Sequence, residues 1–342
     1  MSKKTFRKFS SLENHYRDKF ISLMQIQGKD VGQWVITEKI HGANFSFWFD
    51  GGADVWHAKR SGPCGGDFYS SHKLDKYDPR VELTYDNLLD AGLLEIGDVM
   101  VIYGEIFGGT FFGENEAGSK IVQRGVNYHP GTEFAAFDIQ IISADEDRPN
   151  YILSYEEMLK LIDDEIPTAP ELKRGDFYDL IAEPNDFPSR VPAIFGLEVP
   201  EGEHAQCEGF VLRPVDGEKF LNNGSRCIIK SKNEKYSEKG GAKKNPGQKA
   251  KDAKFNEEEV ALYQKLSLYF NEARLEAVIS KIGEVAWSDF GKLVGLLVQD
   301  AMEDFNKDED IVLKELDFWG KAKKPLGALS GEIVREYLKK TV

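Results

Sequence analysis

A lysine-rich segment divides this chain into two parts with different hydrophobic patterns. Residues 230–254 contain nine lysines and three acidic residues, a net charge of +6, whereas the residues outside the segment sum to −20 and the whole chain to −14. Gly240-Gly241 and Pro246 interrupt the segment, so it cannot form one regular element. We therefore predict a basic linker between two domains. The predicted bounds are 1–235 for the first domain, 236–254 for the linker and 255–342 for the second domain.

The first part contains short runs typical of β-strands, separated by Gly, Pro and Asp turns. These runs extend from Trp34 to about Ile142 and resume near 209–213 and 227–230. Asp50-Gly51-Gly52 lies between two of them and predicts a hairpin turn. Helical spacing of apolar residues predicts helices at 84–95, at 154–162 and near the N-terminus after Ser10 or Ser11. Mostly antiparallel sheets with flanking helices indicate an α+β domain.

The second part shows helical periodicity only. Apolar residues recur on one face over residues 260–282 and 290–305, and again after Ser330. Ser288 is expected to cap the second of these helices. The pattern predicts a small all-α C-terminal domain rather than the short strands of an OB barrel.

Composition narrows the class of protein further. A length of 342 residues fits two domains, and no apolar run approaches the roughly 20 residues of a membrane span. The N-terminus lacks an apolar signal core. The three cysteines form neither a zinc spacing nor a disulfide framework. We therefore expect a cytoplasmic protein (in the host cytoplasm if it is viral), and its acidic balance argues against general affinity for nucleic acid.

Lys39 stands in an unusual position between two predicted strands. It ends the apolar run Trp34-Val35-Ile36 and is followed by His41-Gly42 and Asn44. A lysine amine becomes a nucleophile when burial or neighbouring cations favour its neutral form. The alternative is a surface lysine at a strand edge, where the charge discourages strand pairing. Residues further along the chain decide between the two interpretations.

Five further stretches place charged residues at the ends of predicted strands. In chain order they are Lys59-Arg60-Ser61-Gly62, Tyr103-Gly104-Glu105, Ala136-Phe137-Asp138, Glu208-Gly209-Phe210 and Ile229-Lys230-Ser231-Lys232. Strand side chains alternate with period two, so Lys230 and Lys232 share one face. Each stretch alone is also compatible with solvated charges, and Phe137 with a place in the core.

Taken together and in this order, the stretches resemble a known group of enzymes. With Glu38-Lys39-Ile40-His41-Gly42 they are similar to the covalent nucleotidyltransferase superfamily of polynucleotide ligases and mRNA capping enzymes, and most of all to the bacteriophage RNA ligase 2 family. His41 distinguishes this family, because DNA ligases and capping enzymes usually carry Asp there. The resemblance extends from about Phe6 to Asp304. It implies an ATP-grasp-like adenylyltransferase domain at 1–235.

The resemblance also implies a reaction that passes through a covalent intermediate. Lys39 would attack the α-phosphorus of ATP, release pyrophosphate and carry AMP. Lys230 and Lys232 would neutralise the phosphate, and His41 would serve the transfer of AMP to an RNA 5′-phosphate. Glu208 and Asp138 would hold Mg²⁺, or Mn²⁺ in its place.

The implied contacts fall into two sets. The implied nucleotide contacts are Glu38 and Ile40 along the adenine edge, Phe137 stacked on the adenine, Asn44 shaping the pocket, and Arg60 and Glu105 at the ribose. The implied RNA contacts are Arg213, Arg274, Asp300, Lys243 and Lys244. Two positions depart from the family pattern: Arg213 stands where several relatives have Lys, and Asp304 where a relative has Glu.

The sequence therefore predicts an ATP-dependent RNA ligase that joins 3′-hydroxyl and 5′-phosphate ends, at nicks in duplex RNA, as in RNA repair. We expect it to act as a monomer, with RNA and ATP as partners and no membrane. One alternative is a DNA ligase or a GTP-using capping enzyme, against which His41 and the helical C-terminal part argue. The other alternative is a catalytically silent RNA-binding module, against which Lys39, Lys230 and Lys232 argue.

Overall fold

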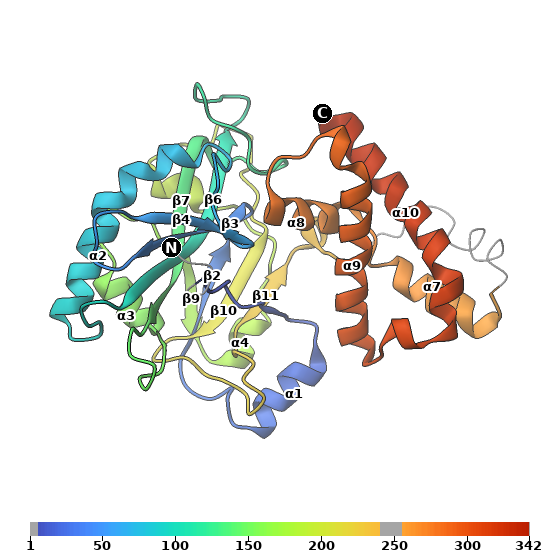
Figure 1. Ribbon diagram of the computed structural model, residues 1–342, viewed down its shortest axis with the longest axis horizontal. Helices are drawn as coiled ribbons and strands as arrows, with labels where there is room; N and C mark the ends of the chain where they lie inside the picture. Colours follow the sequence, from blue (N-terminus) through green and yellow to red (C-terminus); the bar gives the residue numbers. More distant parts are fainter. Residues whose placement is uncertain (1–5, 240–254, 342) are drawn as a thin grey trace. The chain divides into compact units, whose positions relative to one another are not determined.

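The computed structural model describes residues 6–239 and 255–341, and the chain divides into two compact units, Met1–Asn233 and Glu234–Val342 (Figure 1). The division falls inside the lysine-rich segment. Lys243 and Lys244, predicted to contact RNA, lie outside the described residues. The functional assignment of the two domains and of the linker stays a prediction.

Two sheets form the first unit, and the first of them has five strands. Its order is β1 (Glu13–Asn14), β11 (Ile229–Lys232), β10 (Gly209–Pro214), β2 (Trp34–Lys39) and β9 (Glu171–Gly175). Only β1 and β11 run parallel in this sheet. Helices α1 (Asp18–Ile26) and α4 (Phe177–Ile181) contribute Phe20 and Phe177 to the apolar core that this sheet shares with them.

The second sheet has six antiparallel strands. Its order is β5 (Gly62–Pro63), β4 (Trp56–Lys59), β3 (Ala43–Phe49), β6 (Val99–Thr110), β7 (His129–Ile142) and β8 (Tyr151–Ile152). The 3₁₀ helix η1 (Ser71–Tyr77) and helices α2 (Asp78–Asp90) and α3 (Tyr155–Leu161) pack against it. Residues 50–55 join the antiparallel neighbours β3 and β4, as the Asp-Gly-Gly turn predicts.

Residues 40–42 connect the two sheets. β2 of the five-stranded sheet ends at Lys39, and β3 of the six-stranded sheet begins at Ala43. Ile40 is 5% exposed and His41 8% exposed, so this connection is buried rather than a surface loop. The predicted nucleophile thus lies where one sheet passes into the other.

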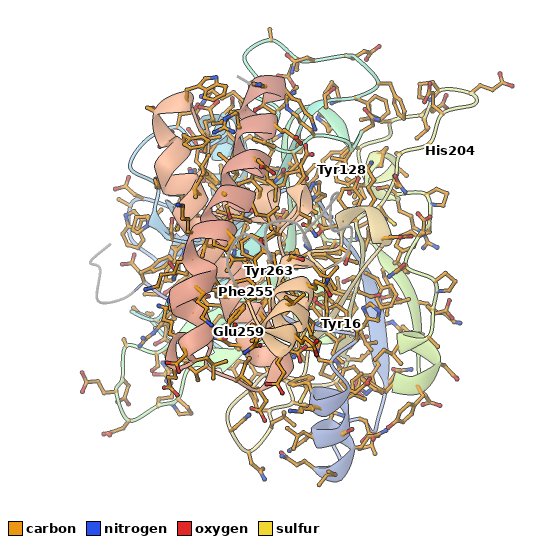
Figure 2. All side chains as sticks on the ribbon, turned by 90° about the vertical axis from the view of Figure 1, so that its right-hand side faces the viewer. Tyr16, Tyr128, His204, Phe255, Glu259 and Tyr263 are labelled. Carbon is orange, nitrogen blue, oxygen red and sulfur yellow. The ribbon has the colours of Figure 1, made fainter. Side chains whose placement is uncertain are left out.

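The second unit is helical. Its α-helices are α7 (Glu257–Ser267), α8 (Glu272–Ile282), α9 (Phe290–Glu309) and α10 (Asp317–Thr341), with 3₁₀ helices η2 (Glu234–Tyr236), η3 (Trp287–Asp289) and η4 (Leu313–Glu315). Phe255 and Tyr263 pack with ring centroids 5.4 Å apart in its core (Figure 2). The predicted α+β class with a helical C-terminal region is confirmed. Within the described ranges, every helix is too short or too polar to cross a lipid bilayer.

Several helix boundaries differ from the predicted ones because tertiary contacts override periodicity. The predicted helix at 260–282 is two helices, since Asn271 caps α8 by accepting a hydrogen bond from the Arg274 N–H at 2.9 Å. Ser288 does not cap α9, because η3 occupies that place. The last helix begins at Asp317 and continues through Pro325.

The N-terminal helix also begins later than predicted. It starts at Asp18, because Glu13 and Asn14 instead form a short strand beside β11. Of the two middle helices, α2 begins at Asp78 and ends at Asp90, earlier than the predicted 84–95, whereas α3 matches the predicted 154–162 closely. Ser154 caps α3 with a capping box that includes Glu157.

Candidate active site

Glu208 lies between two lysines at the meeting point of three strands. Gly209, the first residue of β10, pairs with Lys39 on one side and with Lys232 on the other. Lys39 Nζ lies 2.7 Å from Glu208 Oε2, and Lys232 Nζ lies 2.8 Å from Glu208 Oε1. The Glu208 side chain is 2% exposed. The strand register therefore brings together three residues that lie far apart in the sequence.

Gly209 is required for this arrangement. Its φ of +143° is rare for residues with a side chain, and a Cβ atom would lie 2.0 Å from the Ser231 carbonyl oxygen. Any side chain there would push β10 away from β11. Gly209 thus allows Glu208 and Lys232 to approach each other.

Lys230 and Lys232 alternate with buried neighbours along β11. Ile229 and Ser231 are buried, whereas both lysines are partly exposed. The predicted common face of the two lysines is therefore consistent with the strand geometry.

His41 faces the same carboxylate. Its Nδ1 lies 3.4 Å from Glu208 Oε2. Burial lowers the pKa of His41, although Glu208 acts in the opposite direction. The lowered pKa favours a neutral imidazole at neutral pH. Burial opposes ionisation of Glu208, but Lys232 and Lys39 outweigh burial and hold the pKa of Glu208 well below its ordinary value. The resting pocket thus contains a firmly anionic carboxylate between two cations.

Two residues that the sequence did not indicate hold the His41-Gly42 turn in place. The His41 N–H donates to Tyr128 Oη at 3.4 Å, and Gln123 Nε2 donates to the Gly42 carbonyl at 3.1 Å. A Cβ atom on Gly42 would lie 2.2 Å from the Ile106 carbonyl oxygen, so the turn presses directly against β6. Tyr128 and Gln123 belong to no motif, and only the fold brings them here.

Glu105 lies opposite Asn44 across β6 and β3. Burial raises the pKa of Glu105 to about 7, with Lys39 and Arg60 among the charges that oppose this shift. A carboxyl that is partly protonated at neutral pH can both donate and accept a hydrogen bond, which suits a hydroxyl partner. Arg60 donates to Ser11 Oγ at 3.2 Å, so the N-terminal segment reaches this side of the site.

The raised pKa of Glu105 predicts a pH-dependent stability. Its ordinary value is 4.5, so between about pH 4.5 and pH 7 the folded protein holds a proton that the unfolded chain releases, and stability falls as the pH rises through this window. Glu105→Gln removes this loss. We expect the variant to gain stability relative to the wild type between pH 5 and pH 8, by up to about 3 kcal/mol. Urea unfolding at the two pH values measures the change.

The Glu105→Gln result needs a control for the loss of one negative charge. Glu82→Gln on the exposed side of α2 provides it, because Glu82 lies outside the pocket. An equal stability difference between wild type and Glu105→Gln at both pH values would contradict the prediction.

Phe137 is the extra residue of a β-bulge. Tyr103 pairs with Asp138 and Gly104 pairs with Ala136, which leaves Phe137 without a partner in the register of β6 and β7. A bulge redirects the side chain that it carries. Phe137 is only partly buried, unlike the core residues Phe134 and Ile139 on the same strand.

Glu38 has a structural role beside Lys39. Its carboxylate accepts hydrogen bonds from Ser189 Oγ at 2.6 Å and from the Arg190 N–H at 2.7 Å. Burial nevertheless raises the pKa of Glu38 to about 7. The carboxyl group thus anchors the segment before α5 (Val191–Ile194) to the end of β2. The predicted contact of the Glu38 and Ile40 backbone with adenine stays a prediction.

Two residues with predicted roles in the first unit are buried in internal ion pairs. Asp138 is 2% exposed, and its two oxygens accept hydrogen bonds from Arg213 and Arg226. Both oxygens of Asp138 are thus occupied by arginines in this structure, and the predicted metal role stays a prediction. Arg213 is 3% exposed and bonded to protein groups, and its predicted RNA contact stays a prediction.

Arg274, predicted to contact RNA, is buried in the helical unit. Arg274 is 0% exposed, and its Nη1 lies 2.7 Å from Asp300 Oδ2 and 2.9 Å from Asp304 Oδ2. Its Nη2 donates to the Glu238 carbonyl at 3.1 Å. Asp300 also pairs with Lys281. These groups form an ion-pair cluster within the helical unit, and the predicted RNA contacts of Arg274 and Asp300 stay predictions.

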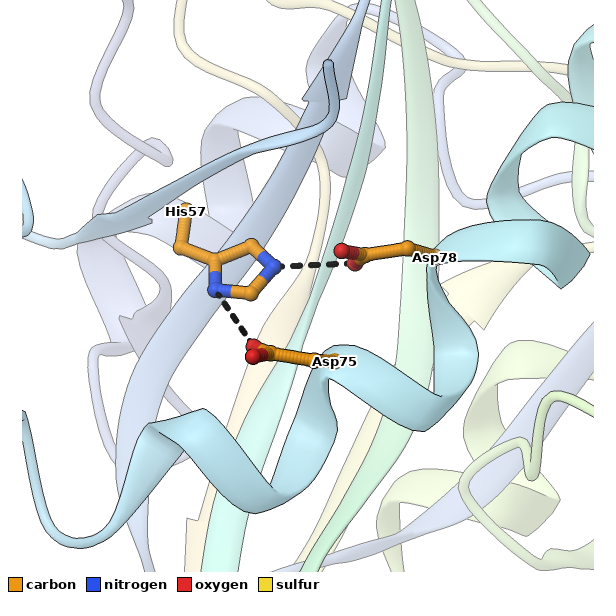
Figure 3. A group of neighbouring side chains, drawn as sticks. All are labelled: His57, Asp75 and Asp78. Atoms are coloured by element: carbon orange, nitrogen blue, oxygen red, sulfur yellow. Dashed lines mark hydrogen bonds and ion pairs between the residues drawn. The ribbon is translucent and has the colours of Figure 1, made fainter.

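A second cluster of titratable groups lies outside the pocket. His57 Nε2 lies 3.0 Å from Asp78 Oδ1, and His57 Nδ1 lies 3.8 Å from Asp75 Oδ1 (Figure 3). Each carboxylate pairs with a different nitrogen of the imidazole, and one ligand atom from each of the three residues lies within 4.8 Å of the others. We interpret the cluster as a link between β4 and the corner where η1 meets α2.

Two sequence models of known protein families match the chain. The sequence model of the RNA ligase family matches residues 32–232, and that of the T4 RNA ligase 2 C-terminal domain matches residues 253–324. The mitochondrial RNA-editing ligase 1 of Trypanosoma brucei brucei is 27% identical, over 85% of this chain and 73% of that protein. RNA-editing ligase 2 from the same organism is 28% identical, over 46% of this chain and 41% of that protein.

A solved Naegleria gruberi RNA ligase with AMP and Mn is 16% identical, with a TM-score of 0.42, over 68% of this chain and 57% of that one. The family assignment rests on the sequence models, the first of which covers more than half of the chain and spans the residues from Lys39 to Lys232. The chain belongs to the RNA ligase family.

Proposed function

We propose that this protein joins RNA 3′-hydroxyl and 5′-phosphate ends with ATP, through AMP attached to Lys39. The observation that carries the proposal is the cluster of Lys39, Glu208, Lys232 and His41 at the ends of β2, β10 and β11. A primary amine beside a second cation and an anion can attack a phosphoanhydride and hold its charged products.

In the first step Lys39 Nζ loses a proton and attacks the α-phosphorus of ATP. The new P–N bond forms as the bond to the leaving pyrophosphate breaks. Lys232 is 12% exposed at its side chain and already faces an anion, so an α-phosphate can take the place that Glu208 occupies at rest. Positioning and charge neutralisation of this kind supply most of the catalysis in phosphoryl transfer.

Glu208 fits a role as ligand for Mg²⁺ or Mn²⁺. It is anionic, it lies in the pocket, and Mg²⁺ typically binds one or two carboxylates together with substrate phosphates and water. A cation bound there would neutralise charge on the phosphate oxygens. Lys39 and Lys232 balance Glu208 in the resting pocket, so the carboxylate keeps its charge before the cation arrives.

In the later steps AMP passes to an RNA 5′-phosphate, the P–N bond breaks and a 5′–5′ phosphoanhydride forms. An RNA 3′-hydroxyl then attacks the RNA phosphorus and AMP leaves. His41 remains the proposed residue for AMP transfer, since its neutral imidazole lies next to Glu208. Lys243 and Lys244 remain proposed RNA contacts, because lysines that neutralise phosphates would give the acidic chain a local affinity for RNA. The alternative is that the lysine-rich segment is only a solvated spacer between the two domains and does not bind RNA.

The proposal is tested by incubation with ATP and a divalent cation, followed by measurement of intact mass. We expect a gain of one AMP that pyrophosphate reverses, and strong preference for ATP over GTP, because a mismatched base leaves polar groups unpaired. A nicked RNA duplex with 3′-hydroxyl and 5′-phosphate ends should then be sealed, whereas one with a 5′-hydroxyl should not. Equal labelling by GTP would favour the capping-enzyme alternative. RNA binding without AMP attachment would favour the silent binding module.

A further inference from the structure

Four charged side chains form a buried network directly behind the Phe137 bulge. They are Asp138 on β7, Arg213 on β10, and Glu218 and Arg226 in the connection from β10 to β11, and each side chain is at most 6% exposed. Their formal charges cancel. The network belongs to none of the roles derived so far.

The network forms a closed ring of ion pairs. Arg213 Nη2 lies 3.3 Å from Asp138 Oδ1 and 2.8 Å from Glu218 Oε1, and Arg226 bonds the other oxygen of each acid. Burying four charges gains little stability over an apolar core of equal volume, because desolvation offsets the attraction. Such a network is better explained by the geometry that it imposes on its neighbours.

The network acts directly on the backbone of Phe137. Arg213 Nη1 donates to the Phe137 carbonyl oxygen at 2.6 Å, and the next residue, Asp138, is a member of the ring. Phe137 has no register partner on β6, so this hydrogen bond replaces contacts that an ordinary strand residue would have. The backbone on both sides of the bulge is therefore held in one position.

An aromatic ring links the network to the Phe137 side chain. The Phe9 ring meets the Phe137 ring edge-on, with centroids 4.9 Å apart, and the Arg226 guanidinium lies 5.8 Å from the centroid of Phe9. Arg226 thus reaches Phe137 through Phe9, and Arg213 reaches it through the backbone. The two arginines restrain both the position and the tilt of the ring.

We propose that Arg213, Arg226 and Glu218 are positioning residues for nucleotide binding, which hold the Phe137 ring where a purine base stacks on it. The inference rests on the proposed function, since it takes ATP as the ligand. None of the three touches the nucleotide. Their effect on affinity passes through Phe137.

The test measures ATP affinity by calorimetry in a Lys39→Ala background, where AMP attachment cannot occur. Arg226→Lys keeps the charge but cannot bond Asp138 and Glu218 with the fixed fork of a guanidinium. We expect the dissociation constant for ATP to rise about three- to tenfold, and Glu218→Gln, a milder change of equal shape, to act in the same direction. Arg148→Lys is the matched control. It weakens the pair of Arg148 with the buried Asp98, away from Phe137, and should leave the affinity unchanged.

A double-mutant cycle separates positioning from general support. Phe137→Ala should raise the dissociation constant about tenfold or more, because stacking on the base is lost. Adding Arg226→Lys to Phe137→Ala should then have no further effect. An equal effect of Arg226→Lys with and without Phe137 would overturn the inference. Failure of the wild type to attach AMP would contradict the proposed function alone, because the cycle measures binding without that step.

Discussion

We expect Lys39→Ala to abolish AMP attachment entirely. This is the largest effect that we predict for any single substitution in this protein. Alanine has no nucleophile, and the Lys39 amine lies 2.7 Å from Glu208 Oε2, the oxygen that His41 Nδ1 faces at 3.4 Å. The neighbouring Lys232 pairs with the other oxygen of Glu208 and cannot take its place without moving. Measurement of the intact mass after incubation with ATP and Mg²⁺ shows directly whether AMP is attached.

The Lys39 experiment has two controls. Lys39→Arg keeps the positive charge next to Glu208 but should also fail to attach AMP, since a guanidinium remains protonated. An RNA nick that already carries AMP on its 5′-phosphate bypasses the missing step, so Lys39→Ala should still seal it. AMP found on Lys230 or Lys232 by peptide mapping would show that the assignment of the nucleophile is wrong.

Arg274→Ala should destabilise the helical unit by about 3–5 kcal/mol, because it removes the buried cation that pairs with Asp304 and, together with Lys281, with Asp300. Arg274 bonds Asp300, Asp304 and the Glu238 carbonyl, and so it joins α8, α9 and the segment that follows η2. Hydrogen exchange measures the local stability of each unit separately. The protection of backbone amides should fall in α8 and α9 but not in β2 or β10. AMP attachment should persist, whereas sealing of nicked RNA should fall.

The Arg274 experiment distinguishes an internal clamp from an RNA contact. Lys340→Met is the control, because it breaks an exposed pair with Glu272 in the same unit and should cost less than about 1 kcal/mol. A direct RNA contact would lower RNA affinity in Arg274→Ala while hydrogen exchange stays unchanged. That outcome would support the role that the sequence predicted.

The order of short motifs, through the family resemblance that it carries, was enough to predict the family of the protein. Lys39, Glu208 and Lys232 each stand at the end of a strand pattern, and period-two alternation placed Lys230 and Lys232 on one face. The α+β class followed from the same local patterns. These features depend on residues that are close together in the chain, so they can be predicted from the sequence alone.

Charged residues whose partners lie far away could not be assigned in the same way. An arginine in a sequence resembles a surface cation, and only the fold shows that Arg213 is bonded to Phe137 and Asp138, 76 and 75 positions earlier in the chain. Arg274 likewise depends on residues that the packing of α8 against α9 brings to it.

The helix boundaries and the Phe137 bulge were also decided by tertiary structure. Asn14 pairs with Lys230 on the neighbouring strand β11. Because of this pairing, the first residues of the predicted N-terminal helix form a strand instead. The bulge exists because β6 and β7 shift register by one residue, a choice that depends on how two strands pack rather than on either strand alone. Local periodicity and motif order thus determined the family and the fold class. The free energy of long-range pairing and burial decided which charges are internal and where each side chain lies.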